Sequence, residues 1–237
     1  MIGSRPGKIP LQKPMIKLLS VADLITLLNA VLGFCGLLLV FSNELRLAAS
    51  LILLGLLADG LDGIIARRFG PSHVGEFLEP LADMISLSIA PLALVYKTYS
   101  TAVASELFLH ILFGAVLVFS LICSIIRLSS FSLLKEKHFF LGLPTSASAI
   151  VLVVLSFLNP DVFYLLPVVI VLSLAMISSI RFPKPGLGVN LIAAVFILAT
   201  IILDNMFYHI APLLLLTALL CYMIIGPIFL YRKKKDS

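Results

Sequence analysis

Four carboxylates stand out because they lie inside strongly apolar sequence. They are Asp59, Asp62, Glu79 and Asp83. An ionised carboxylate near the centre of a membrane helix costs about 3 kcal/mol on insertion scales, so four of them need cations or a polar cavity. This short stretch is therefore the first candidate for a functional site.

The spacing of these acids predicts that they meet. At about 100° per residue, Asp59 and Asp62 lie about 60° apart on one helix, whereas Gly75, Glu79 and Asp83 form one stripe on the next. Two antiparallel helices facing each other would bring all four carboxylates together. Like charges held that close repel, and hard oxygen ligands suit Mg²⁺, Mn²⁺ or Ca²⁺. We therefore predict one or two divalent cations.

The helix that carries the two aspartates also has small residues and a cation. Gly63 and Ala66 would allow a backbone or a flat ligand to approach closely. Arg67 would supply a fixed positive charge beside the acids. The stretch thus combines ligands for a cation with a surface for an anionic partner.

The composition indicates which elements must position these groups. Of all residues 61% are hydrophobic and 12% charged, and the mean hydropathy is +1.16, values that indicate an integral membrane protein. Several apolar runs exceed 18 residues, which favours helices over the short alternating strands of a barrel. The net charge of +5 comes from basic residues beside the spans, so it favours anionic lipid head groups over nucleic acid.

We predict an all-α polytopic protein with about eight spans. A basic segment, residues 1–22, would include a short interfacial helix near Leu11–Leu19. A catalytic core, residues 23–186, would be followed by two further spans and a basic tail, residues 187–237. The fifth span is short and is expected to be broken or tilted. The expected spans are Asp23–Phe41, Leu45–Phe69, Gly75–Tyr96, Leu107–Leu128, Leu143–Leu158, Val162–Ile180, Leu187–Leu203 and Phe207–Leu230.

Basic residues predict the orientation of these spans. With the N-terminus in the cytoplasm, fifteen of the seventeen Lys and Arg residues fall on the cytoplasmic side, and only Arg46 and Lys97 fall outside. Both termini and the acid cluster would then face the cytoplasm, in the cytoplasmic membrane. Arg127 would lie at a span end on the same side, either as a snorkelling anchor or as a clamp for an anion.

The acid-rich stretch resembles the signature of the CDP-alcohol phosphotransferases, D-x-x-D-G-x-x-A-R followed by G-x-x-x-D-x-x-x-D. Two features differ from that pattern. Glu79 stands where the pattern has Asp, and seven residues separate Arg67 from Gly75 where the pattern has eight. The matching positions are Asp59, Asp62, Gly63, Ala66, Arg67, Gly75 and Asp83.

Further segments resemble the phosphatidylserine and archaetidylserine synthase branch of this family. Arg127–Phe131 and Gly142–Ala149 are similar to its R-L-A-R-F and G-L-P-x-P-x-A-A segments, and Asp83–Pro91 is similar to its D-x-x-S-F-G-x-A-P. Thr26 and Asn29 match the T-x-x-N of its first helix. The substituted positions are Leu87, Ser88, Ser130 and Ser146.

The resemblance implies a six-helix catalytic core and a homodimer that transfers a lipid phosphate group from a CDP-activated lipid to an alcohol, with serine favoured. It implies two Mg²⁺ or Mn²⁺ ions held by Asp59, Asp62, Glu79 and Asp83. Asp83 would also act as the base, and Arg127 and Ser86 would contact the acceptor or a lipid phosphate. The residues implied to bind the CDP moiety are Thr26, Asp59, Asp62, Gly63, Ala66, Arg67 and Gly75.

Three alternatives stay open at this level. The acceptor could instead be inositol phosphate or glycerol phosphate, although a phosphorylated acceptor calls for more cations than Arg127 alone. Intramembrane carboxylates also mark cation or proton transporters, but no matching acid pair occurs in the second half of the chain. A catalytically silent scaffold is suggested only by Glu79.

Overall fold

The computed structural model describes residue 16 and residues 19–69, 74–130, 139–203 and 210–235. The side chains of residues 62–69, 229 and 232–235 lie outside this description. Nearly all of the predicted basic N-terminal segment is therefore outside it as well. Asp62, Gly63, Ala66 and Arg67 are placed by their main chain alone.

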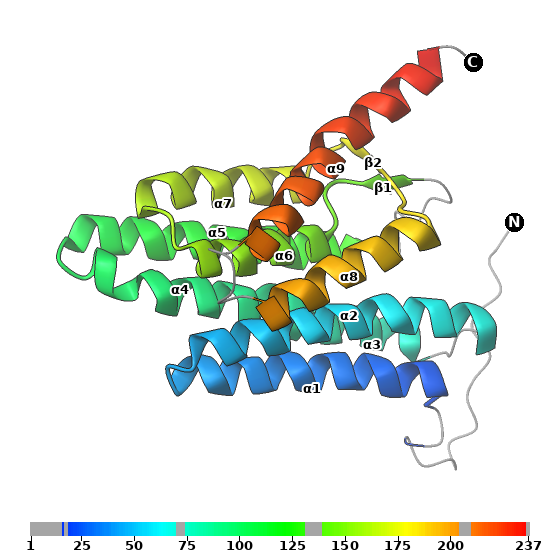
Figure 1. Ribbon diagram of the computed structural model, residues 1–237, viewed down its shortest axis with the longest axis horizontal. Helices are drawn as coiled ribbons and strands as arrows, with labels where there is room; N and C mark the ends of the chain where they lie inside the picture. The colour runs from blue at the N-terminus through cyan, green and yellow to red at the C-terminus, as the bar shows by residue number, and fades with distance from the viewer. Residues whose placement is uncertain (1–15, 17–18, 70–73, 131–138, 204–209, 236–237) are drawn as a thin grey trace, which may run out of the picture.

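In the described chain the helices within residues 21–176 form a roughly antiparallel bundle, the last two helices run obliquely across it, and one small two-stranded ribbon is present (Figure 1). The predicted all-α class is confirmed except for that ribbon. The elements are α1 (Val21–Phe41), α2 (Leu45–Phe69), α3 (Gly75–Asp83), the π-helix η2 (Met84–Ile89), α4 (Ala90–Val103), α5 (Leu107–Ser130), β1 (Phe139–Leu141), α6 (Thr145–Leu158), α7 (Val162–Met176), β2 (Arg181–Pro183), α8 (Leu187–Leu203) and α9 (Ile210–Lys235).

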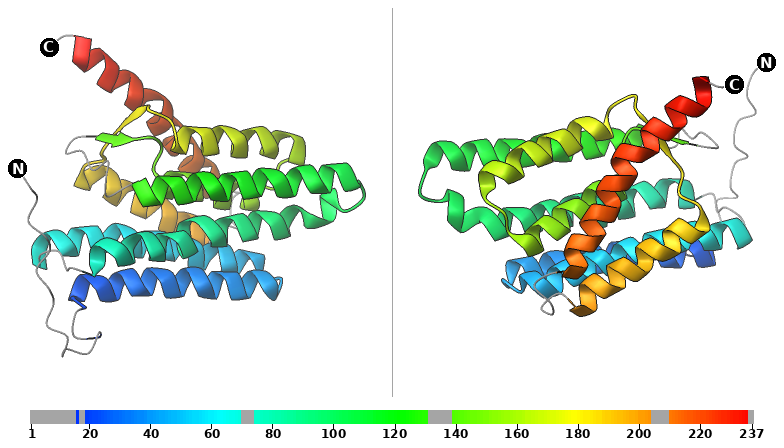
Figure 2. Two further views of the ribbon diagram at one scale, coloured as in Figure 1. Left: turned by 180° about the vertical axis from the view of Figure 1, so that it is seen from behind. Right: turned by 45° about the horizontal axis from the view of Figure 1, so that its top comes forward.

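The start of α1 is fixed by a capping box. The Ser20 hydroxyl accepts from the Asp23 amide at 3.3 Å, and the Ser20 amide donates to the Asp23 carboxylate at 2.6 Å. Asp23 is consequently the third residue of the helix, and α1 begins two residues before the predicted span. At its other end Asn43 takes a positive φ of 65°, and the chain turns there into α2. The two helices lie side by side (Figures 1 and 2).

The third predicted span is a single rod made of three parts, α3, η2 and α4. It runs to Val103, beyond the predicted end at Tyr96. In its middle the Ala90 amide donates to the Ile85 carbonyl, five residues back, as a π-helix requires. Pro91 follows and has no amide proton to donate to Leu87, so a regular α-helical bond is impossible there. The wider π turn begins directly after Asp83.

The fifth span, α6, is short but unbroken. Its 14 residues are about 21 Å long, less than the roughly 30 Å of a bilayer core. Every residue from Ala147 to Leu155 is buried, so α6 forms the centre of the bundle rather than its lipid-facing surface. α6 starts at Thr145 rather than at the predicted Leu143, because the preceding residues form β1 and a turn at Gly142, whose φ is +76°.

The strands β1 and β2 pair antiparallel, with Phe140 opposite Phe182. This ribbon was not predicted from the sequence. It also explains why α7 ends at Met176 rather than at Ile180, because the chain must leave the helix to form β2. The ribbon lies at the same end of the bundle as the start of α6 (Figure 1).

The last two helices, α8 and α9, cover α2 and α6 from one side. Within the described residues, four helices are long and apolar enough to cross a membrane, whereas α6, α7 and α8 are shorter apolar helices. These features fit an integral membrane protein, and the predicted total of eight spans stays a prediction. The four helical stretches are Val21–Phe41, Gly75–Val103, Leu107–Ser130 and Ile210–Ile228.

Candidate active site

A cavity of about 180 Å³ opens where α2, α3, α5 and α6 meet at one end of the bundle. Because neighbouring helices are antiparallel, the ends of α2 and α5 and the starts of α3 and α6 come together there. The distribution of basic residues predicted that the acid cluster and Arg127 lie on one side of the membrane. The cavity is lined by Asp59, Glu79, Pro80, Asp83, Leu87, Arg127, Leu128, Phe140, Pro144, Thr145 and Ser146.

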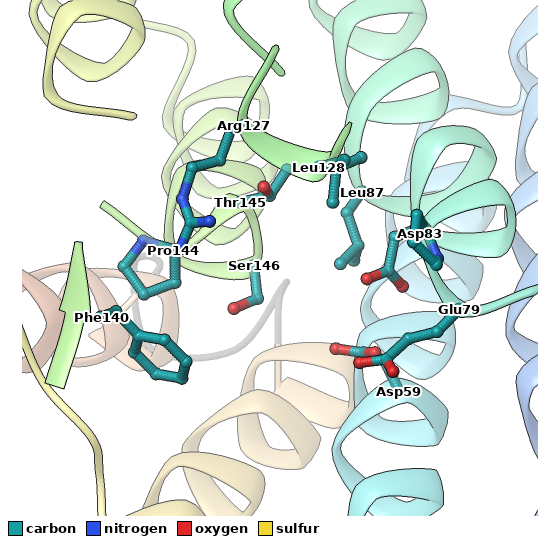
Figure 3. A pocket seen from close by; sticks show the side chains of 11 residues that line it. Asp59, Glu79, Asp83, Leu87, Arg127, Leu128, Phe140, Pro144, Thr145 and Ser146 are labelled. Atoms are coloured by element: carbon teal, nitrogen blue, oxygen red, sulfur yellow. The ribbon is translucent and has the colours of Figure 1, made fainter. Parts of the chain in front are cut away.

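One wall of the cavity carries acids. Asp59 comes from α2, and Glu79 and Asp83 come from α3, one helical turn apart. Figure 3 shows the three carboxyl groups gathered on the same side. Asp83 is the most enclosed, with 9% of its surface exposed, and it accepts a hydrogen bond from the Asn29 side-chain amide at 3.0 Å. The predicted meeting of the two acid-bearing helices is thus present for these three residues.

The donor chemistry of this wall suits a hard divalent cation, because all three side chains offer carboxylate oxygens. Among the described residues, however, no three His, Cys, Asp or Glu side chains lie close enough to form a metal-binding group. The fourth predicted ligand, Asp62, is on α2 three residues beyond Asp59, and its side chain lies outside the description. Metal binding at this wall stays a prediction.

The opposite wall carries positive charge. Arg127 of α5 is buried, with 7% exposed, and its Nε donates to the main-chain carbonyl of Leu143 at 3.3 Å. Thr145 and Ser146, the first residues of α6, line the cavity beside it (Figure 3). The start of a helix carries unpaired amides and a partial positive charge. The cavity is therefore bipolar, with carboxylates facing a guanidinium and a helix N-terminus.

Other predicted site residues lie away from this cavity lining. Thr26 is buried on α1 and its hydroxyl donates to the Ala22 carbonyl at 3.2 Å, and Gly75 is the first residue of α3. Ser86, predicted to contact the acceptor, is fully buried against α1 and donates to the Ala82 carbonyl at 3.1 Å. Contact of Ser86 with the acceptor stays a prediction, and the structure shows this residue in the π-helix, packed against α1.

Sequence reasoning gave no role to several residues that the structure brings to the site. Asn29 contacts Asp83, and Phe140, Thr145 and Ser146 line the cavity. The signal was present in part, since Asn29 and the Gly142–Ala149 segment both belong to the resemblance described above. The role of Asn29 was missed because its contact with Asp83 joins residues 54 positions apart.

Comparison with known proteins shows the enzyme family to which the residues of this cavity belong. The sequence profile of the CDP-alcohol phosphatidyltransferases matches residues 19–180, which include every residue that lines the cavity. The chain belongs to the CDP-alcohol phosphatidyltransferase family. It is accordingly an enzyme of the CDP-alcohol phosphotransferase class, as the acid pattern predicted.

Relatives of this enzyme include archaeal and bacterial proteins. An archaetidylserine synthase of Methanothermobacter thermautotrophicus is 34% identical over 187 residues, covering 75% of this chain and 76% of the relative. A CDP-diacylglycerol--serine O-phosphatidyltransferase of Methanocaldococcus jannaschii is 34% identical over 169 residues, covering 71% and 76%. A protein of the same description from Helicobacter pylori is 28% identical over 180 residues, covering 68% and 71%.

Proposed function

We propose that this enzyme transfers the phosphatidyl or archaetidyl group of a CDP-activated lipid to L-serine, releases CMP and uses Mg²⁺ or Mn²⁺. The relatives named above act, by their descriptions, on serine. The observation that carries the proposal is the bipolar cavity. It offers carboxylates on one wall and Arg127 with the start of α6 on the other.

The acid wall would receive the activated lipid. Asp59, Asp62, Glu79 and Asp83 would hold the divalent cations, which supply positive charge that offsets the diphosphate. By the family resemblance, Thr26, Gly63, Ala66, Arg67 and Gly75 would pack against or contact the CDP moiety.

The basic wall would receive the acceptor. Arg127 is the one Lys or Arg side chain among the described residues that line the cavity. A guanidinium matches a carboxylate in both charge and geometry. The N-terminus of α6 adds amide donors for the same anion. A single guanidinium suits the carboxylate of serine better than the doubly charged phosphate of inositol phosphate or glycerol phosphate.

In the chemical step, serine held at the basic wall would react with the CDP-lipid held at the acid wall. The serine hydroxyl oxygen attacks the lipid-side phosphorus, a new phosphorus–oxygen bond forms, and the bond to the CMP oxygen breaks with its electron pair leaving on CMP. Asp83 takes the hydroxyl proton as the general base. The walls act mainly by holding hydroxyl and phosphorus in line, and correct positioning alone contributes a large part of such rate enhancements.

The placement in the membrane is part of the same proposal. The distribution of basic residues supports a cavity on the cytoplasmic side of the cytoplasmic membrane, where CDP-lipid and serine would meet. We further propose a homodimer among membrane lipids, on the family resemblance alone.

The test is CMP release by the purified protein with Mg²⁺ or Mn²⁺. CDP-diacylglycerol and CDP-archaeol are each offered with serine, inositol phosphate or glycerol phosphate. Release with serine alone is expected. Release with only another acceptor would keep the family and reject serine. No release with any acceptor, together with metal-ion flux through reconstituted vesicles, would favour a transporter.

A further inference from the structure

We propose that Asn29 is a positioning residue that sets the orientation of the Asp83 carboxylate. The inference rests on the proposed role of Asp83 as the base. Asn29 is on α1, does not line the cavity and is completely buried. It therefore acts through Asp83 and not on a substrate.

The contact between the two side chains has a defined polarity. Asn29 Nδ2 donates to Asp83 Oδ1 at 3.0 Å. The reverse orientation of the amide would place its carbonyl oxygen against the carboxylate, where two acceptors repel. The bond therefore holds one carboxylate oxygen and, with it, the rotation of the whole carboxyl group. This rotation decides where the second oxygen of Asp83 points.

The amide lies close to the main chain of α2 at Gly55. A Cβ atom at Gly55 would lie 3.2 Å from Asn29 Oδ1, closer than ordinary contact. Gly55 is one helical turn before Asp59. The same contact thus sets α1 against the helix that carries another acid of the cavity.

Packing alone does not explain an asparagine at this position. Its Oδ1 is buried and has no hydrogen-bond partner among the described residues, which lowers stability. A leucine has the same branching and would avoid that cost, although its side chain is larger. One turn further along α1, Gly33 lies directly against Ser86. Asn29 and Gly33 thus give α1 contacts with both Asp83 and the π-helix that follows it.

The first test is Asn29→Leu, with Asn29→Ala beside it. We expect kcat for CMP release to fall about 10- to 100-fold, as for residues that orient a ligating or catalytic carboxylate. The KM values for CDP-lipid and serine should stay unchanged. The melting temperature in detergent is measured beside kcat, because the lost hydrogen bond to Asp83 and, in Asn29→Ala, the lost side-chain volume can each lower it. A merely structural residue would lower the melting temperature and leave kcat per folded protein unchanged, and that result would overturn the inference.

The second test changes the α2 residue that lies next to the Asn29 amide. Gly55→Ala should press on the amide and lower kcat, and this effect should largely vanish in the Asn29→Ala background. The matched control is Gly114→Ala on α5, where an added Cβ meets nothing within 4 Å. Additive effects of Gly55→Ala and Asn29→Ala would show that Gly55 does not act through Asn29 and would contradict the proposal.

Asp83→Asn separates this inference from the proposed function. If Asp83→Asn keeps full turnover, the base assignment fails and the positioning role fails with it. If Asp83→Asn abolishes turnover while Asn29→Leu leaves kcat unchanged, only the positioning role is rejected. Loss of kcat in both variants, with CDP-lipid KM unchanged in Asn29→Leu, supports both.

Discussion

Arg127 and Leu143 are joined by a hydrogen bond from the guanidinium Nε to the main-chain carbonyl, 3.3 Å long. The bond connects the end of α5 to the turn just before α6. Leu143 is itself fully buried, and its amide donates to the Ala175 carbonyl of α7 at 2.9 Å. The guanidinium is therefore attached to a rigid main-chain segment at the start of α6. Both sources of positive charge in the cavity keep one fixed arrangement.

This arrangement predicts the effect of Arg127→Met. The KM for serine should rise about 10- to 100-fold, because a hydrogen bond to a charged group contributes about 1.5–3 kcal/mol. The KM for CDP-lipid should change little. Steady-state CMP release at varied serine concentration measures this. Arg46→Met, at an exposed position at the start of α2, is the control. An equal rise in the KM for CDP-lipid would place Arg127 on the donor side.

Asp83→Asn tests the base directly. The amide keeps the size of the side chain but cannot accept the hydroxyl proton, so kcat should fall about 10²- to 10⁴-fold. Binding of CDP-lipid at saturating Mn²⁺, followed by equilibrium binding of a labelled analogue, should persist because Asp59, Asp62 and Glu79 remain to hold the cations. Retained turnover would remove Asp83 from the role of base.

Glu79 allows a comparison with the family pattern, which has Asp there. Shortening the side chain withdraws the carboxylate by about an ångström, a shift that can cost up to about 100-fold in rate. We expect Glu79→Asp to lower kcat within that limit and Glu79→Gln to lower it further, because charge is lost. CMP release across a Mn²⁺ titration compares the two variants. Higher activity in Glu79→Asp would contradict this expectation and would mean that the position of α3 suits an aspartate better than a glutamate.

Gly33→Ala tests the packing of α1 against η2. A Cβ atom there would lie 2.5 Å from Ser86 Cα, so the main chain of one element must move. Overpacking of this kind costs about 1–3 kcal/mol. Thermal unfolding in detergent should show a lower melting temperature for Gly33→Ala and none of this loss for Gly114→Ala. Equal melting temperatures would show that the interface yields without cost.

The helices and the acid wall could be predicted because local patterns specify them. Apolar runs locate the helices within a few residues, and the four-residue repeat of Glu79 and Asp83 places both on one face of α3. The alternation of antiparallel helices then brings Asp59 and Arg127 to the same end. These inferences need only helix periodicity and chain direction.

The remaining features depend on contacts between distant segments. The bond between Asn29 and Asp83 and the pairing of Phe140 with Phe182 have no local signature. Ser86 was predicted at the acceptor by resemblance, and the sequence did not show that it lies in a π-helix packed against Gly33. Pro91 signals an interrupted bond, yet it does not by itself distinguish a kink from a wider turn.

The π-helix between Asp83 and Ala90 acts as an angular offset within one continuous rod. It contains one residue more per hydrogen-bonded ring than the α-helix on either side. Removing a single residue from Met84–Ile89 would restore regular winding and rotate α3 by about 100° relative to α4. Glu79 and Asp83 would then swing away from Asp59 together, while α4 kept its place in the core. One inserted residue thus sets the direction in which both acids face.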